Sequence, residues 1–267
     1  MLVAPLASGS SGNCAIVTAG RGADTVAVCL DCGIPQRAAR TLAEQAGASL
    51  TGVDAVLLTH RHSDHSANVV QVAARARAPL FAHEGALGHN QRTSEAERTR
   101  RGVQTLPIHD GVAFSIGPLR VTPVQVPHDA EPTFGFLFEA DGRRAGFFTD
   151  LGHGEVLDEA RLDGLDTLVL EFNHCTEMLR TGPYPRELRE RVGGRAGHLS
   201  NDQAGEILAS AAPRSLRRLV LAHLSERNNL PEIALAAAHD GLRRRGLSEV
   251  EVLLAPKRGL PEGLLPA

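Results

Sequence analysis

The first half of the chain alternates short apolar segments with polar turns. Each segment is rich in Val, Ile, Leu and Ala and has the length of a buried β-strand. The predicted strands of this half occupy residues 1–6, 14–19, 25–30 and 53–58. A helix is expected over about 35–46. A second helix is expected after residue 65, because Ser66, Val69, Val70 and Ala73 recur at helical spacing.

The middle of the chain predicts a run of antiparallel strands. Their ranges are 103–108, 111–117, 119–126, 133–140 and 144–150. The sequences HDG at 109–111 and DGR at 141–143 are hairpin signals between them.

The second half returns to alternating strands and helices. Strands are expected at 166–172, 217–223 and 249–255, with helices at about 201–212 and from Pro231 onward. No repeat, low-complexity tract or linker interrupts the chain, so we expect a single domain over 1–267. Antiparallel-rich sheets with flanking helices predict an α/β sandwich with its helices outside.

The most unusual segment is THRHSDH at 59–65, directly after a predicted strand. His60 and His62 are two residues apart, so in extended backbone they point the same way and can share one metal ion. Asp64 and His65 follow where the chain turns into a helix, and they can face a second ion. Imidazole and carboxylate ligands suit zinc, and also manganese or iron.

Two metal ions need more ligands than this cluster supplies, and the candidates lie at the ends of later strands. They are His128, Asp150 and His223. Strand ends are where α/β scaffolds place functional groups. Each histidine alone would be an ordinary polar residue, but together with the 59–65 cluster the set predicts a dinuclear metal site.

Composition narrows the classes of function that remain. The hydrophobic content of 42% can fill a core, and the net charge of −3 gives no global attraction to nucleic acid. The basic residues are 27 Arg and a single Lys, Lys257, and the chain has one Tyr and no Trp for stacking on bases. No apolar run approaches the roughly 18 residues of a membrane span, and no signal peptide is recognisable, so we expect a cytoplasmic protein without membrane partners.

The cysteine pattern gives little sign of a disulfide scaffold. Cys14, Cys29, Cys32 and Cys175 are expected to be reduced. Cys29 and Cys32 form a CxxC, but no second pair accompanies it, so a redox or zinc role is not favoured.

The ligand pattern resembles that of the metallo-β-lactamase superfamily, which implies a four-layer αβ/βα sandwich. The resemblance implies that His60, His62 and His128 bind the first metal and that Asp64, His65 and His223 bind the second. Asp150 would bridge the two. Asp31, in CLDCG, matches the acidic residue that buttresses the ligand loop.

A closer resemblance is to the YycJ (WalJ) family of bacterial nucleases. It rests on motifs from residue 8 to 229, in the expected order. They include SGSSGNC, LDCG, THRHSDH, VPHDA, FFTDLG, LEFNH, GHLSN and LAHLSERNN. The resemblance implies 5′-to-3′ exonuclease action on DNA, DNA repair, and two Zn²⁺ or Mn²⁺ ions per chain. Cys175 departs from the aspartate of the family, which leaves the role of 173–175 open.

Phosphodiester cleavage by such a centre uses a metal-activated hydroxide and needs a proton for the leaving group. Asp64 and Asp150 would act in catalysis through the metals. His198, in GHLSN, is the candidate general acid or oxyanion stabiliser. Ser200 and Gln203 predict a capping box, which would put His198 beside a helix N-terminus. A structural loop histidine is the alternative.

Two further segments could contact phosphate. In the turn GSSGN at 9–13, Ser10, Ser11 and Asn13 could bind it, although a plain hairpin turn explains the same residues. Residues 180–195 hold five Arg against two Glu. Among them, Arg186, Arg189 and Arg191 could bind the DNA backbone, or the segment could be a solvated helix.

Other functions use related sites. An RNA-processing nuclease or a cyclic phosphodiesterase stays open as the alternative, and a thioester or β-lactam hydrolase would not need the arginines or His198. Flavodiiron redox proteins carry Glu in place of His62, so hydrolysis is favoured. A binding module that only keeps the fold tends to lose ligands, and this chain has lost none.

Overall fold

The computed structural model describes residues 1–257 and 259, and these form two compact units. The first unit comprises Met1–Gln125, Ala130–Arg143 and the described residues from Ala255 onward. The second comprises Val126–Asp129 and Arg144–Leu254. Each unit takes more than one stretch of the chain. The single domain expected from the sequence stays a prediction.

The first unit is built on a six-stranded sheet in which the strands follow chain order. Its strands are β1 (Leu2–Ala7), β2 (Cys14–Ala19), β3 (Val26–Leu30), β4 (Ala55–Leu57), β5 (Leu80–Ala82) and β6 (Thr105–Pro107). The first three strands pair antiparallel, and β3 through β6 pair parallel. The carboxyl ends of β3 and β4 therefore lie at the same edge, where Asp31 and the 59–65 cluster follow.

Part of the antiparallel prediction was wrong. Strand β6 pairs parallel with β5, because the chain returns through α4 (Glu95–Arg100) before it enters β6. The sequence HDG at 109–111 therefore does not close a hairpin. It leads from the six-stranded sheet to β7 (Phe114–Ile116), which pairs antiparallel with β8 (Leu119–Val126).

The other hairpin signal, DGR at 141–143, is confirmed. It forms a two-residue turn between β9 (Thr133–Ala140) and β10 (Arg143–Phe148). Asp141 and Gly142 have φ of 56° and 70°, the positive values that such a turn requires.

The second unit continues with parallel strands. They are β10, β11 (Thr167–Glu171), β12 (Arg218–Ala222) and β13 (Glu251–Leu254), each paired with the next. Strands buried in a parallel sheet are rich in apolar residues, as LVL at 168–170 and LVLA at 219–222 are here. Asp150, Glu171 and His223 stand at the carboxyl ends of these strands.

The helices expected at 35–46, at 201–212 and from Pro231 agree with the structure to within a few residues. The helices of the first unit are α1 (Gln36–Gln45), α2 (Ser63–Ser66), α3 (Val69–Ala76) and α4, and those of the second are α5 (Glu159–Leu162), α6 (Thr176–Thr181), α7 (Arg186–Val192), α8 (Asn201–Ala211) and α9 (Pro231–Arg245). Of these, α4, α5 and α6 were not predicted. The helix predicted after the histidine cluster is two helices, separated at Ala67 and Asn68.

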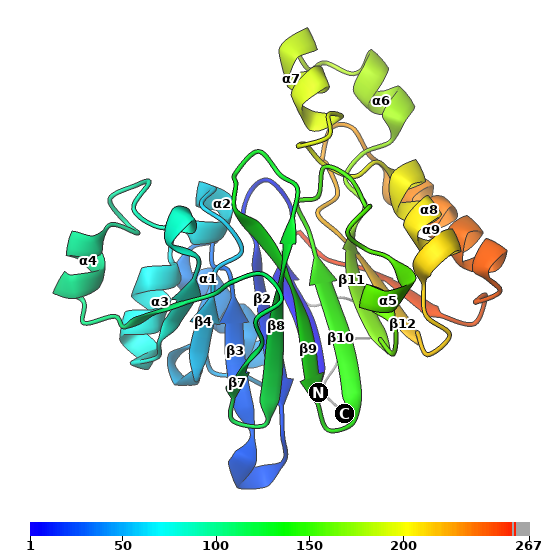
Figure 1. Ribbon diagram of the computed structural model, residues 1–267. Helices are drawn as coiled ribbons and strands as arrows, with labels where there is room; N and C mark the ends of the chain where they lie inside the picture. Colours follow the sequence, from blue (N-terminus) through cyan, green and yellow to red (C-terminus); the bar gives the residue numbers. More distant parts are fainter. Residues whose placement is uncertain (258, 260–267) are drawn as a thin grey trace. The chain divides into compact units, whose positions relative to one another are not determined.

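Helices α8 and α9 lie side by side (Figure 1). Their close approach depends on two glycines, since a Cβ on Gly241 would lie 2.4 Å from the Gly205 carbonyl oxygen. Pro231 occupies the first turn of α9, as the sequence predicts, and Gly246 ends the helix in a left-handed conformation. Among the described residues, no helix combines the length and apolarity that crossing a bilayer requires.

Candidate metal centre

The 59–65 cluster in the first unit has the local structure that the sequence predicts. His60 follows β4 and is fully buried, while His62 occupies the N-cap position of α2 without a capping hydrogen bond from its side chain. Asp64 and His65 lie within α2. The ring centroid of His60 is 4.8 Å from that of His62 and 4.2 Å from that of His65. The strand end and the short helix thus bring the three imidazoles together.

Asp31 holds this cluster in place, as the resemblance implies. Its Oδ1 accepts a hydrogen bond from Thr59 N (2.9 Å), and its Oδ2 accepts one from Thr59 Oγ1 (2.8 Å). The same Oδ2 lies 2.7 Å from His65 Nδ1. Asp31 has φ of 55°, which is unusual for a residue with a side chain and places its carboxylate over the end of β4.

Asn13 is placed differently from its neighbours in the GSSGN turn. Ser10 and Ser11 are exposed, whereas Asn13 is 7% exposed and its Nδ2 lies 2.8 Å from His65 Nε2 and 3.3 Å from Asp64 Oδ2. Its Oδ1 accepts a hydrogen bond from Gly9 N (2.9 Å). This position suits orientation of the ligands more than the substrate contact predicted for Asn13.

The second unit collects the later candidates at its strand ends. One donor atom from each of Asp150, Glu171, His198 and His223 lies within 4.8 Å of the others. Asp150 and His223 are almost fully buried and have φ of 61° and 57°. His128 is also buried, and its Nε2 lies 3.8 Å from Asp150 Oδ1.

Glu171 belongs to this group of donors and was not predicted from the sequence. It is fully buried at the end of β11 and accepts hydrogen bonds from Leu151 N and Leu199 N, both at 3.0 Å. Its Oε1 lies 2.9 Å from His198 Nδ1 and 2.8 Å from His223 Nδ1. The available signal was a lone acidic residue closing the apolar strand TLVLE.

Glu171 and His198 each stabilise the charged form of the other. Burial alone would raise the pKa of Glu171, but the charges and hydrogen bonds of His198 and His223 lower this pKa to about 2. Burial likewise disfavours charge on His198, but the Glu171 carboxylate, with Asp150 and Asp129, raises the pKa of His198 to about 9. The pair therefore favours a carboxylate beside an imidazolium.

The stretch 173–175, which the sequence left open, supports the strand end that carries His223. Asn173 Nδ2 donates to the His223 carbonyl oxygen (2.9 Å). Asn229 Nδ2 donates to the Asn173 carbonyl oxygen (3.0 Å), and Cys175 precedes α6. This stretch contributes position rather than a donor to the group.

The predicted arginines lie on α7 and are exposed or half-buried. Arg186 Nε donates to Glu190 Oε1 (2.7 Å) within the helix. Arg191 Nε donates to Asp129 Oδ2 (2.5 Å), next to His128. Both already donate Nε to a carboxylate within the protein, and their role as substrate contacts stays a prediction.

The CxxC pair does not resemble a reactive site. Both Cys29 and Cys32 are free and fully buried. A hydrogen bond with Cys14, together with burial, raises the pKa of Cys32, which disfavours the thiolate that redox chemistry or zinc binding needs.

The donor set fits divalent metal ions because four of the proposed histidine ligands are buried and have an oxygen partner on Nδ1. The partners are Thr59 Oγ1 for His60 (2.9 Å), Asp31 Oδ2 for His65 (2.7 Å), Gly197 O for His128 (2.9 Å) and Glu171 Oε1 for His223 (2.8 Å). Metal-binding histidines are oriented in this way, with Nε2 directed at the ion.

Comparison with known proteins agrees with this chemistry. The family model of the beta-lactamase superfamily domain matches residues 27–224. The chain is 30% identical over 247 residues to Exodeoxyribonuclease YycJ of Bacillus anthracis, which covers 90% of this chain and 89% of that relative. It is 27% identical over 232 residues to Exodeoxyribonuclease WalJ of Streptococcus pneumoniae serotype 2 strain D39, covering 86% and 83% of the two chains.

Among solved structures, Zn²⁺-bound PqqB from Methylobacterium extorquens has a similar fold. The TM-score is 0.69 at 21% identity, over 98% of this chain and 99% of PqqB. The fold and the donor set define a metal-dependent hydrolase of the metallo-β-lactamase fold, as the sequence predicts. The chain belongs to the beta-lactamase superfamily and, within it, to the family of the YycJ and WalJ exodeoxyribonucleases.

Proposed function

We propose that the chain binds two divalent metal ions, Zn²⁺ or Mn²⁺, and hydrolyses phosphodiester bonds. His60, His62 and His128 would hold one ion, and Asp64, His65 and His223 the other, with Asp150 between them. The observation that carries this proposal is that four of the proposed ligands have an oxygen partner on Nδ1, which orients Nε2 as a metal donor. They are His60, His65, His128 and His223.

The chain's own residues divide the remaining work. Bound ions would supply a nucleophile from water near neutral pH and offset charge on the phosphate. His198 donates a proton to the leaving oxygen, and Glu171 fixes the orientation of this imidazole through Nδ1 (2.9 Å). Asp31 and Asn13 hold the loop at residues 59–65, which carries four of the proposed ligands, in position.

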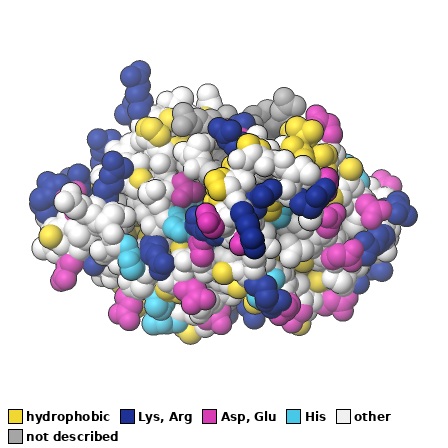
Figure 2. Space-filling view, turned by 90° about the horizontal axis from the view of Figure 1, so that it is seen from above, with side chains coloured by type: hydrophobic (Ala, Val, Ile, Leu, Met, Phe, Trp, Pro, Cys, Tyr) yellow, Lys and Arg dark blue, Asp and Glu magenta, His cyan; other side chains and the backbone are white. Residues whose placement is uncertain are grey.

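The proposed substrate is DNA, degraded from the 5′ end as part of repair in the cytoplasm. Support comes from the similarity to relatives named exodeoxyribonucleases over most of the chain. On the face that Figure 2 shows, Lys and Arg side chains are interspersed with Asp and Glu. Local contacts from Ser10, Ser11 and the arginines of α7 would hold the backbone. An RNA or a cyclic phosphodiester is the alternative substrate.

Two variants separate the proposed roles. Asp150→Ala should remove a shared ligand, so that the protein loses metal and activity together. His198→Ala should keep the metal content of the wild type and slow DNA hydrolysis by about 10²–10⁴-fold, the usual contribution of acid–base catalysis. Elemental analysis of purified protein, beside the rates, distinguishes the two. Equal metal loss in His198→Ala and His223→Ala would make His198 a ligand and end its role as general acid.

A further inference from the structure

A cavity of about 620 Å³ in the first unit lies against the ligand loop. Its lining is polar and comes from three segments: Ser10 and Ser11; Gly33 with Ser63, Asp64 and Ala67; and Asn90, Gln91 and Arg92. Only the first segment and Asp64 have a role in the proposed function. The loop at 90–92 has none so far.

Close backbone packing joins this cavity to the proposed metal ligands. A Cβ on Gly33 would lie 1.6 Å from the Asp64 carbonyl oxygen, so only glycine fits there. Asn13 N donates to that same carbonyl oxygen (2.7 Å), which ties the turn carrying Ser10 and Ser11 to α2. A ligand in the cavity would therefore be held beside Asp64.

The loop that carries Arg92 is internally braced. Asn90 Oδ1 accepts hydrogen bonds from Arg92 N (2.9 Å) and Thr93 N (3.1 Å). Arg98 Nη1 donates to the Thr93 carbonyl oxygen (2.7 Å), and Thr93 is fully buried. Within residues 1–257 and 259, the Arg92 guanidinium makes no ion pair or hydrogen bond, so a cation is presented without an internal partner.

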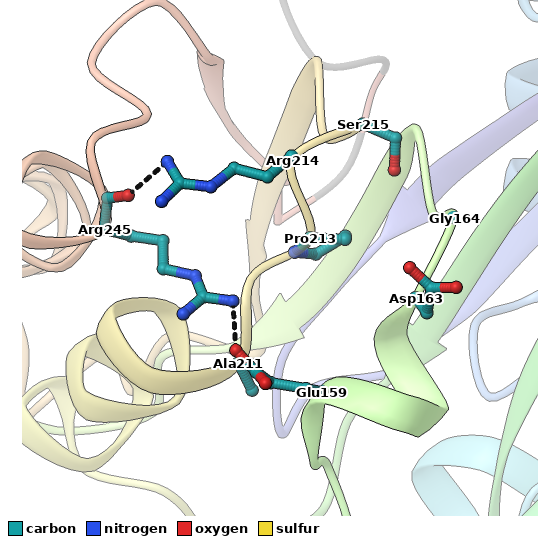
Figure 3. Close-up of a pocket in the computed structure, with 8 residues that line it drawn as sticks. All are labelled: Glu159, Asp163, Gly164, Ala211, Pro213, Arg214, Ser215 and Arg245. Carbon is teal, nitrogen blue, oxygen red and sulfur yellow. Dashed lines mark hydrogen bonds and ion pairs between the residues drawn. The ribbon is translucent and has the colours of Figure 1, made fainter.

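In another polar pocket, which lies in the second unit, the arginines have partners within the protein (Figure 3). Arg214 Nη1 donates to the Arg245 carbonyl oxygen (2.8 Å). Arg245 donates to the Ala212 carbonyl oxygen (2.9 Å) and pairs with Glu159. The cations of that pocket are engaged within the protein, whereas Arg92 is available for an external anion.

We propose that the cavity beside Asp64 binds the 5′-terminal phosphate of a DNA strand, with Arg92 as its counter-charge and the hydroxyls of Ser10, Ser11 and Ser63 as donors. This inference rests on the proposed nuclease function and deepens it. A terminal phosphate carries more negative charge than an internal one and pairs with a guanidinium through charge-assisted hydrogen bonds. A cavity of this size accommodates a nucleotide. Seating the chain end there would favour digestion from the 5′ end.

Binding of matched oligonucleotides tests the inference. Phosphorothioate single strands of one sequence, with a 5′-phosphate or a 5′-hydroxyl and a fluorophore at the 3′ end, are titrated with metal-loaded protein and followed by anisotropy. The wild type should bind the phosphorylated strand about 10-fold more tightly, the usual scale of one hydrogen-bonded charge pair. Arg92→Ala should lose this preference and bind the hydroxyl strand as the wild type does.

The matched control is Arg75→Ala. Arg75 is an exposed arginine on α3 of the same unit and does not line the cavity, so its replacement removes one positive charge elsewhere. This control should keep the preference for the phosphorylated strand. Equal weakening of both strands by Arg92→Ala, or equal binding of both by the wild type, would overturn the inference.

Failure of the inference and failure of the function are distinguishable. If the wild type digests DNA but treats the two 5′ ends alike, the cavity is not a terminal-phosphate site and the nuclease proposal stands. If it binds the phosphorylated strand selectively through Arg92 but digests no DNA, the cavity assignment stands and the nuclease proposal fails.

Discussion

At the scale of single residues, unusual backbone conformations mark the proposed centre. Five non-glycine residues among those described have positive φ, and three of them are Asp31, Asp150 and His223. Each follows a strand by one or two residues. Such conformations cost of order 1–3 kcal/mol and persist where the surrounding structure enforces them. Their concentration at the proposed centre indicates that the fold accepts this backbone cost in order to direct these three side chains into the centre.

Glu171 should be the most sensitive residue that is not itself a proposed ligand. Glu171→Gln keeps the shape of the side chain but replaces one acceptor oxygen with a donor amide, so the contacts to His198, His223 and two backbone amides cannot all be kept. Loss of such a supporting partner typically weakens metal affinity by about 10–100-fold. Competition with a chelator of known affinity measures this change.

The control for Glu171→Gln is Glu249→Gln, the same chemical change at an exposed loop position of the second unit. This control should leave metal affinity unchanged. Unchanged affinity in Glu171→Gln would show that Glu171 does not orient His223.

At the scale of elements, the sequence predicted the features that depend on neighbouring residues alone, namely the strand ranges and a helix cap. Strand ranges follow from apolar runs, and the capping box at Ser200 and Gln203 is present in the structure. The partner of β6 was predicted wrongly, because the choice between a hairpin and a crossover depends on distant strands. Glu171 was missed for a similar reason, since its histidine partners follow 27 and 52 residues later.

The capping box predicts a measurable contribution of Ser200 to stability. Ser200 Oγ accepts a hydrogen bond from Gln203 N (3.1 Å), and Gln203 Oε1 accepts one from Ser200 N (2.9 Å). Ser200→Ala should lower the free energy of unfolding by about 1 kcal/mol. Urea denaturation measures this free energy of unfolding. The control is Ser210→Ala, at the exposed far end of α8, which should change the free energy of unfolding by less than about 0.5 kcal/mol. Equal effects would mean that the cap contributes nothing.

Helix α7 should contribute to DNA binding through charge. Each phosphate neutralised by an arginine adds about −0.9 to the salt slope for duplex DNA, or about −0.7 for a single strand. Replacing Arg186, Arg189 and Arg191 with Ala should weaken binding at low salt and flatten its salt dependence. Hydrolysis of a small chromogenic phosphodiester, which reaches only the metals, should barely change. If the triple variant lost DNA binding and hydrolysis of the small phosphodiester equally, α7 would have a structural role rather than a role in binding DNA.

At the scale of the whole molecule, the proposed ligands come from both compact units. His60, His62, Asp64 and His65 belong to the first unit, and His128, Asp150 and His223 belong to the second. The sequence allowed these seven to be grouped because each follows a predicted strand and together they match a superfamily pattern. Asn13 was predicted as a phosphate contact, and only the folded chain shows that its side chain lies against His65 and Asp64.

The central claim is that this centre hydrolyses DNA from a 5′ end, and digestion of linear duplex DNA labelled at either end tests it most directly. With Mn²⁺ or Zn²⁺ added, the wild type should release a 5′ label early as mononucleotide and a 3′ label only late, while Asp150→Ala should release neither. Intact DNA under conditions in which the same preparation degrades RNA, or release of the 3′ label first, would contradict the account.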